Sequence, residues 1–162
     1  MVKIAQETEH NPKLTSAELG NLWLTFMDDS MFKCILQYFV EKNEDKNMKP
    51  IFEYALDLTQ KHLKTISEFY KMDNRPVPQG FTDEDVIKTA PRLFSDIFML
   101  IYVNHSARYR MTIDALSLGD SSRSDIRNFY SELTASIIEL FQKSTELMLA
   151  KGIYVRAPQI PT

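Results

Sequence analysis

Two groups of residues in this sequence are of types that bind metals or transfer protons. The first group lies in "SDIFMLIYVNH", residues 95–105, where Asp96 and His105 stand at the two ends of a strongly apolar run. On an α-helix, that separation places the two side chains half a turn out of alignment and about 13.5 Å apart along the axis. They therefore cannot share one metal ion. Arg92 lies four residues before Asp96, a spacing that favours a local ion pair instead.

The second group gathers near the middle of successive predicted helices. Asp28 and Asp29 lie in the first helix, His62 in the second and His105 in the third. In an antiparallel bundle they can meet as one polar layer, which would also take in Asn104, Ser136 and Glu139. His62 falls on an apolar stripe, so we expect Asp28 to pair with it in the interior. Asp29 lies four residues before Lys33, a spacing that predicts an outward pair.

Three interpretations of this polar layer stay open: a hydrogen-bonded set that fixes helix register, a divalent-metal site, or a general acid–base pair. Di-iron bundles use Glu-x-x-His pairs, whose spacing puts both ligands on one helix face. None of the four predicted helices contains such a pair. We therefore expect no metal and no other cofactor. Should a divalent metal bind, its candidate ligands are Asp28, Asp29, His62 and His105.

Four long helices must position these residues. Apolar residues recur at helical spacing over 15–42, 48–70, 91–118 and 122–151, and we predict a helix in each range. Capping or helix-terminating residues mark the expected ends: Thr15 with Glu18, Pro50, Pro91, Gly119, Ser122 and Gly152. A short helical turn with Thr82 as its cap is expected between the second and third helices.

The connections between these helices predict the topology. The first and last pairs are joined by short connectors, which favours two antiparallel hairpins, and the link of about 20 residues between them is long enough to cross the bundle. The predicted fold is therefore all-α: a ferritin-like four-helix bundle with one long crossover between helices two and three. It forms a single domain over residues 1–162, with an extended C-terminal tail over 152–162.

Composition excludes several classes of function. The net charge is −3 and no basic block occurs, so we expect no nucleic-acid partner. The longest apolar run, "IFMLIYV", is too short to span a membrane, and the N-terminus lacks the apolar core of a signal peptide. We therefore expect an intracellular or assembly-associated soluble protein. Only four glycines occur, too few for a phosphate-binding loop. Cys34 is the single cysteine, and its surroundings predict a buried apolar role.

The third predicted helix is apolar on nearly every side around "FMLIYV". A helix in a four-helix bundle normally leaves one side to water, so this pattern predicts an additional cover. The cover would be the crossover, the tail with Ile153 and Tyr154, or a second copy of the chain. The last of these covers corresponds to the hypothesis of a homodimer through this helix.

The sequence resembles a known family. The stretches that carry the resemblance run from about residue 14 to residue 160 and are "LTSAELGNLW", "MDDSM", "QKH", "VPQGFTDEDV", "APRLFSD", "RSDIRNFYSE" and "AKGIYVRAPQI". They are similar to the DUF3231 family of spore-forming bacilli. The resemblance implies a ferritin-like bundle, present here as one copy. Members are often labelled as candidate spore coat proteins, and the family has no established activity.

These observations favour a non-enzymatic structural or interaction protein of the cytoplasm or the spore coat. Its expected partners are a second copy of the chain or other coat proteins, with neither nucleic acid nor membrane involved. One alternative is a ferritin-like protein that binds a divalent metal at an altered site, acting as an oxidase or a metal store. Another alternative is a helical bundle that binds a small molecule between its helices.

Overall fold

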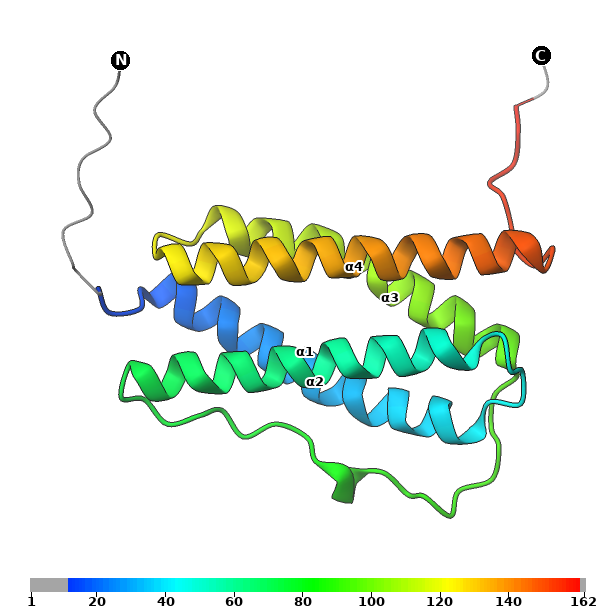
Figure 1. Cartoon of the computed structure of the whole chain (residues 1–162), viewed down its shortest axis with the longest axis horizontal. Coiled ribbons are helices and arrows are strands. Elements are labelled where there is room, and N and C mark those ends of the chain that lie inside the picture. The colour runs from blue at the N-terminus through cyan, green and yellow to red at the C-terminus, as the bar shows by residue number, and fades with distance from the viewer. Residues whose placement is uncertain (1–11, 161–162) are drawn as a thin grey trace.

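Four long α-helices make up most of the computed structural model, which describes residues 12–160 (Figure 1). They are α1 (Ser16–Lys42), α2 (Lys49–Met72), α3 (Asp96–Gly119) and α4 (Ser124–Ala150), with a short 3-10 helix, η1 (Asp83–Asp85), between α2 and α3. No strand occurs among the described residues, so the predicted all-α four-helix fold is confirmed. Within that range, no helix combines the length and apolar character needed to cross a membrane.

The helices pair as two antiparallel hairpins, α1 with α2 and α3 with α4. Figure 1 shows α2 and α4 nearer the viewer, with α1 and α3 behind them. Residues 73–95 run along the outside of the bundle from the end of α2 to the start of α3, so these two helices point the same way. The predicted long crossover is thus present. A closer relation to ferritin stays a prediction.

Helix ends follow the sequence signals in several places. Thr15 and Glu18 form the predicted capping box of α1, and Thr82 caps η1 as expected. Gly152 adopts a φ of 68° just after α4, a backbone conformation that favours glycine and ends the helix.

Helix α3 begins later than predicted, at Asp96 instead of near Pro91. The Tyr38 hydroxyl accepts a hydrogen bond from the Leu93 N–H at 2.7 Å and donates to the Pro91 carbonyl at 2.9 Å. These bonds hold the residues before α3 in a non-helical path along α1. The side chain of Ser95 then caps the helix by accepting from the Phe98 N–H.

Helix α4 also begins without the predicted cap. Ser122 does not cap α4, because both its backbone N–H and its hydroxyl donate to Glu18, at 2.8 and 3.0 Å. The Arg123 N–H donates to the same carboxylate oxygen at 2.8 Å. The fully buried carboxylate of Glu18 therefore caps α4 from the first turn of α1.

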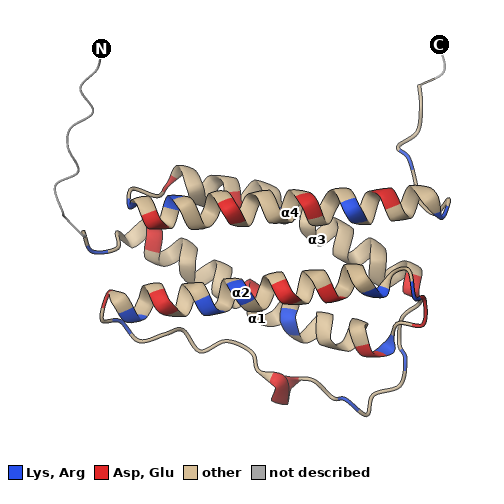
Figure 2. Cartoon of the chain, viewed as in Figure 1, with Lys and Arg blue, Asp and Glu red and all other residues tan. Residues whose placement is uncertain are grey.

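The apolar core receives side chains from all four helices. The largest fully buried apolar residues are Tyr130, Phe39, Phe52, Leu22, Leu36, Ile66, Met99, Leu100, Ile126, Leu133 and Leu140. Charges are distributed unevenly around this core: Figure 2 shows them spaced along α2 and α4 but sparse along α3. The four charged residues of α3 are Asp96, Arg108, Arg110 and Asp114.

The additional cover predicted for α3 is only partly present. Phe94, just before the helix, stacks on Phe98 at a centroid distance of 4.6 Å, and Ile153 of the tail packs against the core. Tyr109 and Leu116 nevertheless remain 70% and 66% exposed. The side of α3 that faces away from the core is therefore apolar and open to solvent.

Candidate functional site

Four charged or titratable residues meet inside the bundle, at the level where a polar layer was predicted. We call Asp29, His62, Arg110 and Asp114 the buried charge cluster; they come from α1, α2 and α3, and each is at most 9% exposed. Arg110 lies at its centre, donating through Nη1 to Asp29 Oδ1 at 2.5 Å and through Nε to Asp114 Oδ2 at 3.3 Å. The His62 Nδ1 lies 3.2 Å from Asp29 Oδ2, without the alignment of a hydrogen bond.

The two carboxylates of this cluster differ in their electrostatics. Burial alone would raise the pKa of Asp29, but the Arg110 guanidinium and His62 hold it below its ordinary value. Burial also acts on Asp114, and there it outweighs the attraction of Arg110, so the pKa of that carboxyl is raised. Asp29 is therefore the carboxylate that holds its negative charge against Arg110.

The structure corrects the predicted pairing of His62. Asp28 was expected to face His62, but Asp28 is half-buried on the side of α1 next to α3, and Asp29 occupies the interior position. Lys33, the expected partner of Asp29, instead forms an ion pair with Asp83 of η1 at 2.7 Å. Desolvation raises the pKa of Asp28, more than Arg110 lowers it.

Other members of the predicted polar layer lie elsewhere. His105 is exposed on α3 and does not reach the cluster. Asn104 is buried and donates to Ser144 Oγ and Thr145 Oγ1 of α4, at 2.9 and 2.8 Å. Glu139 lies at the surface, where it accepts from the Tyr54 hydroxyl at 2.7 Å. The predicted layer therefore divides into one interior cluster and separate helix–helix contacts.

Asp96 lies at the start of α3, as far from the cluster as its sequence position suggested. The predicted ion pair with Arg92 is present at 2.8 Å. The same carboxylate oxygen accepts from the Asn43 side chain at 2.8 Å and from the Glu44 N–H at 3.1 Å. Asp96 thus ties the connector between α1 and α2 to the start of α3.

The cluster is poorly suited to a metal ion. Arg110 already supplies a positive charge between the two carboxylates, the place that a cation would take in a metal-binding bundle. Among residues 12–160, no three or more His, Cys, Asp or Glu side chains lie close enough together to hold a metal ion. The donors at this level therefore fit a self-neutralised charge network.

Arg110 and Asp114 were missed by the sequence argument, although a signal for them exists. Buried residues recur along α3 in steps of three and four: Val103, Ala107, Arg110, Asp114 and Ser117. An arginine on such a buried stripe has five N–H donors to satisfy, more than Asp114 alone can accept, and unpaired buried donors are costly. That reasoning would have pointed to a carboxylate on a neighbouring helix.

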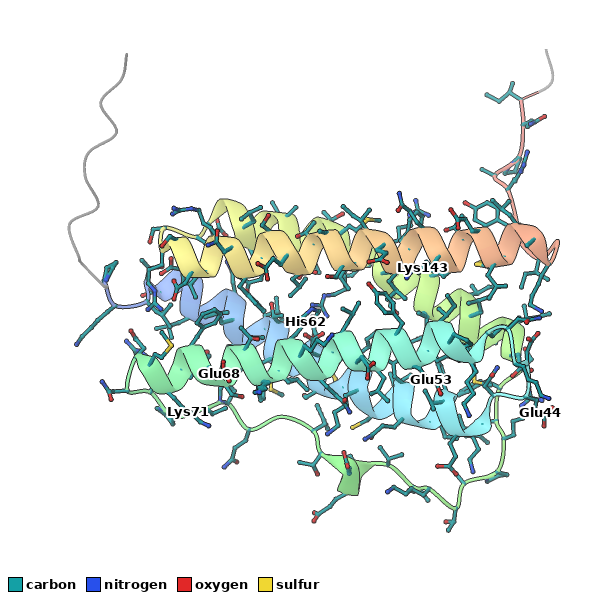
Figure 3. The ribbon with its side chains drawn as sticks, in the orientation of Figure 1. Glu44, Glu53, His62, Glu68, Lys71 and Lys143 are labelled. Carbon is teal, nitrogen blue, oxygen red and sulfur yellow. The ribbon has the colours of Figure 1, made fainter. Side chains whose placement is uncertain are left out.

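A groove lies outside the cluster, between α2 and α4. It has a volume of about 560 Å³. Its apolar lining comes from Leu58, Phe69, Phe129 and Leu133, and its polar lining includes Lys61, His62, Asn128 and Glu132. Figure 3 shows His62 on the side of α2 that faces α4. The His62 ring packs edge-on against Phe129 and lies between the groove and the Asp29 carboxylate.

A second concave surface lies between α1, the crossover and α3. One part, of about 490 Å³, is lined mainly by apolar side chains, among them Ile35, Leu93, Phe98 and Tyr102. The adjoining part, of about 300 Å³, shares Ile35 and Tyr102 and extends to Met31 and Tyr109. We call the whole the α1–α3 face. Continuous exposed apolar surface of this kind is typical of sites where proteins associate.

Cys34 lies at the edge of the α1–α3 face. It is half-buried, not fully buried as predicted, and its Sγ donates to the Thr82 carbonyl at 3.3 Å. Burial raises the pKa of this thiol. The side chain thus helps to hold the crossover against α1 and is not set up as a nucleophile.

A family model described as "Protein of unknown function (DUF3231)" matches residues 2–162. No curated protein matches the chain. The crystal structure of a candidate spore coat protein from Bacillus halodurans C-125 superimposes with a TM-score of 0.84 at 15% identity, covering 93% of this chain and 98% of that chain. At this identity, the likeness shows a shared fold alone.

Proposed function

The chain belongs to the DUF3231 family, and from this premise we propose that it is a non-enzymatic structural or interaction protein associated with the spore coat. The family's activity is not established. The observation that carries the proposal is the α1–α3 face, where large apolar side chains are exposed along two helices and the crossover. Exposed members include Met31, Phe98 and Tyr109, at 41%, 46% and 70%.

The buried charge cluster supports a non-enzymatic role. A general acid or base must reach the substrate, directly or through one water. Asp29 is 1% exposed and Asp114 is fully buried, and the guanidinium of Arg110 binds both. These groups therefore act on one another and fix how α1, α2 and α3 face each other. The description of the similarly folded Bacillus halodurans protein as a candidate spore coat protein is what supports the suggested setting in the coat.

The proposal can be tested in a spore-forming bacillus that expresses the tagged chain. We expect the protein in coat extracts of purified spores, and we expect Tyr109→Glu to reduce its incorporation. The matched control is Ile138→Glu, which changes an apolar residue of α4 that is 40% exposed and lies off the α1–α3 face. A wild-type chain that stays outside the coat fraction would contradict the proposal.

A second candidate function, small-molecule binding, is favoured by the groove between α2 and α4. Its volume of about 560 Å³ is in the range of ligand pockets, and His62 is one of several polar groups that lie beside its apolar side chains. Screening small aromatic alcohols by NMR would test it. Binding should shift the His62 ring resonances and should be lost in His62→Phe. Shifts that are the same in both proteins would count against this groove.

A further inference from the structure

The exposed side of α3 carries a regular stripe of residues. The stripe, which we call the α3 seam, consists of Phe98, Tyr102, His105, Tyr109, Thr112 and Leu116, and none of its members is buried. Successive members are separated by four, three, four, three and four residues. This alternation is the spacing at which one helix packs its side chains into the gaps of another. The seam is therefore suited to a helical partner.

The order of the seam also indicates which helix that partner is. An isologous two-fold interface requires that residue i of one copy meets residue j of the other, and j meets i. The alternation of four and three reads the same from both ends of the seam. Antiparallel pairing about residue 107 therefore brings Phe98 to Leu116, Tyr102 to Thr112, and His105 to Tyr109 of a second copy. We infer that α3 of one copy packs antiparallel against α3 of another, forming a two-fold homodimer.

The α1–α3 face supplies further area beside the seam. Leu24, Asp28 and Met31 recur along the side of α1 next to α3, where Asp28 and Met31 line the same concavity as Tyr102 and Tyr109. Leu24 is 40% exposed. The exposed surface of Phe98, Tyr102 and Tyr109 amounts to roughly 300 Å² per copy. The exposed aliphatic side chains beside them bring the apolar area of the face to about 500 Å² per copy. Two copies would bury about 1,000 Å², the lower limit for a specific interface.

Charge on α3 is compatible with this arrangement at a small cost. The seam itself carries no Asp, Glu, Lys or Arg. Arg108, which lies beside the seam, is the exposed charged residue of α3. Around the two-fold axis, the two copies of Arg108 lie on the same flank and repel each other. Salt screens such exposed charges. The dimer should therefore tighten as ionic strength rises, the opposite of an interface held by ion pairs.

This inference rests on the proposed function, since it names one partner for the α1–α3 face. Sedimentation equilibrium of the whole chain over a wide concentration range tests it. We expect the average mass to rise from one copy toward two in the micromolar range. Tyr109→Glu should remain at one copy, and Ile138→Glu should behave as wild type. Circular dichroism of each variant checks that the helices are intact.

Cross-linking tests the register. In a Cys34→Ser background, the double change Tyr102→Cys with Thr112→Cys should give a covalent dimer on mild oxidation. The matched pair Tyr102→Cys with Leu116→Cys is one helical turn out of register and should cross-link much less. A chain that remains monomeric at every concentration, or two pairs that cross-link equally, would overturn the inference. A dimer formed by a chain that never enters the coat would contradict the proposed function only.

Discussion

The Glu18 carboxylate on α1 accepts a hydrogen bond from the backbone N–H of Arg123, 105 residues away, at 2.8 Å. The same carboxylate closes the capping box of α1 through the Thr15 N–H, also at 2.8 Å. One side chain thus satisfies unpaired N–H groups at the starts of two helices from different hairpins. Such groups would otherwise be left without a partner away from water.

Replacing Glu18 should therefore cost more than losing an ordinary helix cap. Glu18→Ala leaves the N–H groups of Thr15, Ser122 and Arg123 without their acceptor. We expect the free energy of unfolding to fall by about 2–4 kcal/mol, measured by urea titration. The control is Thr15→Ala, which removes one capping bond at the same helix and should cost about 1 kcal/mol. Equal losses would show that Glu18 does not stabilise α4.

Stability should depend on pH through the same group. Burial would raise the pKa of Glu18, but its hydrogen bonds to Arg123, Thr15 and Ser122 lower it from 4.5 to about 2. Because the folded pKa is depressed, the stabilisation is complete above pH 4.5 and is lost as pH falls toward 2. The loss is on the order of 3 kcal/mol. Unfolding measured across this window should show a shallower dependence in Glu18→Gln than in the wild type.

Substitutions of the adjacent residues Asp28 and Asp29 should differ strongly in their effect on stability. Asp29→Asn removes the negative charge opposite Arg110 inside the bundle and should cost about 3–5 kcal/mol. Asp28→Asn alters a half-buried carboxylate at the solvent-exposed boundary between α1 and α3 and should cost less than about 1 kcal/mol. Thermal and urea unfolding of the two variants provide the comparison. The reverse order would mean that Asp28 is the interior carboxylate.

The crossover is held by a close contact that glycine permits. A Cβ atom at Gly80 would lie 2.5 Å from Ser30 Oγ and 2.7 Å from Ser30 Cβ. Ser30 Oγ also accepts from the Phe81 N–H at 3.0 Å. Gly80→Ala should therefore displace the crossover from α1 and lower the free energy of unfolding by about 1–3 kcal/mol.

Gly20 offers a matched control for that substitution. It lies exposed in α1, and a Cβ atom there meets nothing within 4 Å. Gly20→Ala should raise the free energy of unfolding by about 0.5–1 kcal/mol, since alanine favours the helix. Faster proteolysis within residues 73–95 should accompany Gly80→Ala alone. Unchanged proteolysis in Gly80→Ala would argue against the contact with Ser30.

Sequence reasoning succeeded where the signal was local. The capping box of Thr15 and Glu18, the periodic helices and the long crossover all depend on residues close together in the chain. The second role of Glu18 was not predictable in this way, because Ser122 is 104 residues away. Pro91 suggested an early start for α3, and the distant Tyr38 hydroxyl prevented it.

The error over Asp28 and Asp29 has a similar cause. Adjacent helical residues differ by about 100° in direction, so either one can face the interior. Lys33 offered Asp29 a partner at helical spacing, but the crossover brings Asp83 to Lys33 instead. The ion pair with Arg110 of α3 accounts for the burial of Asp29 rather than Asp28. The periodicity of one helix cannot predict which of two adjacent residues is buried when a residue of another helix determines it.

The arrangement in two hairpins also bears on how the chain folds. Contacts of α1 with α2 and of α3 with α4 join segments near in sequence, and such contacts form fast, before long loops close. The bond between Asp29 and Arg110 joins the two hairpins, so we expect it to form after the rate-limiting barrier. Asp29→Asn should then accelerate unfolding in stopped-flow experiments and leave the refolding rate almost unchanged. The interior ion pair would therefore determine how slowly the folded bundle unfolds, and would have little influence on how fast it folds.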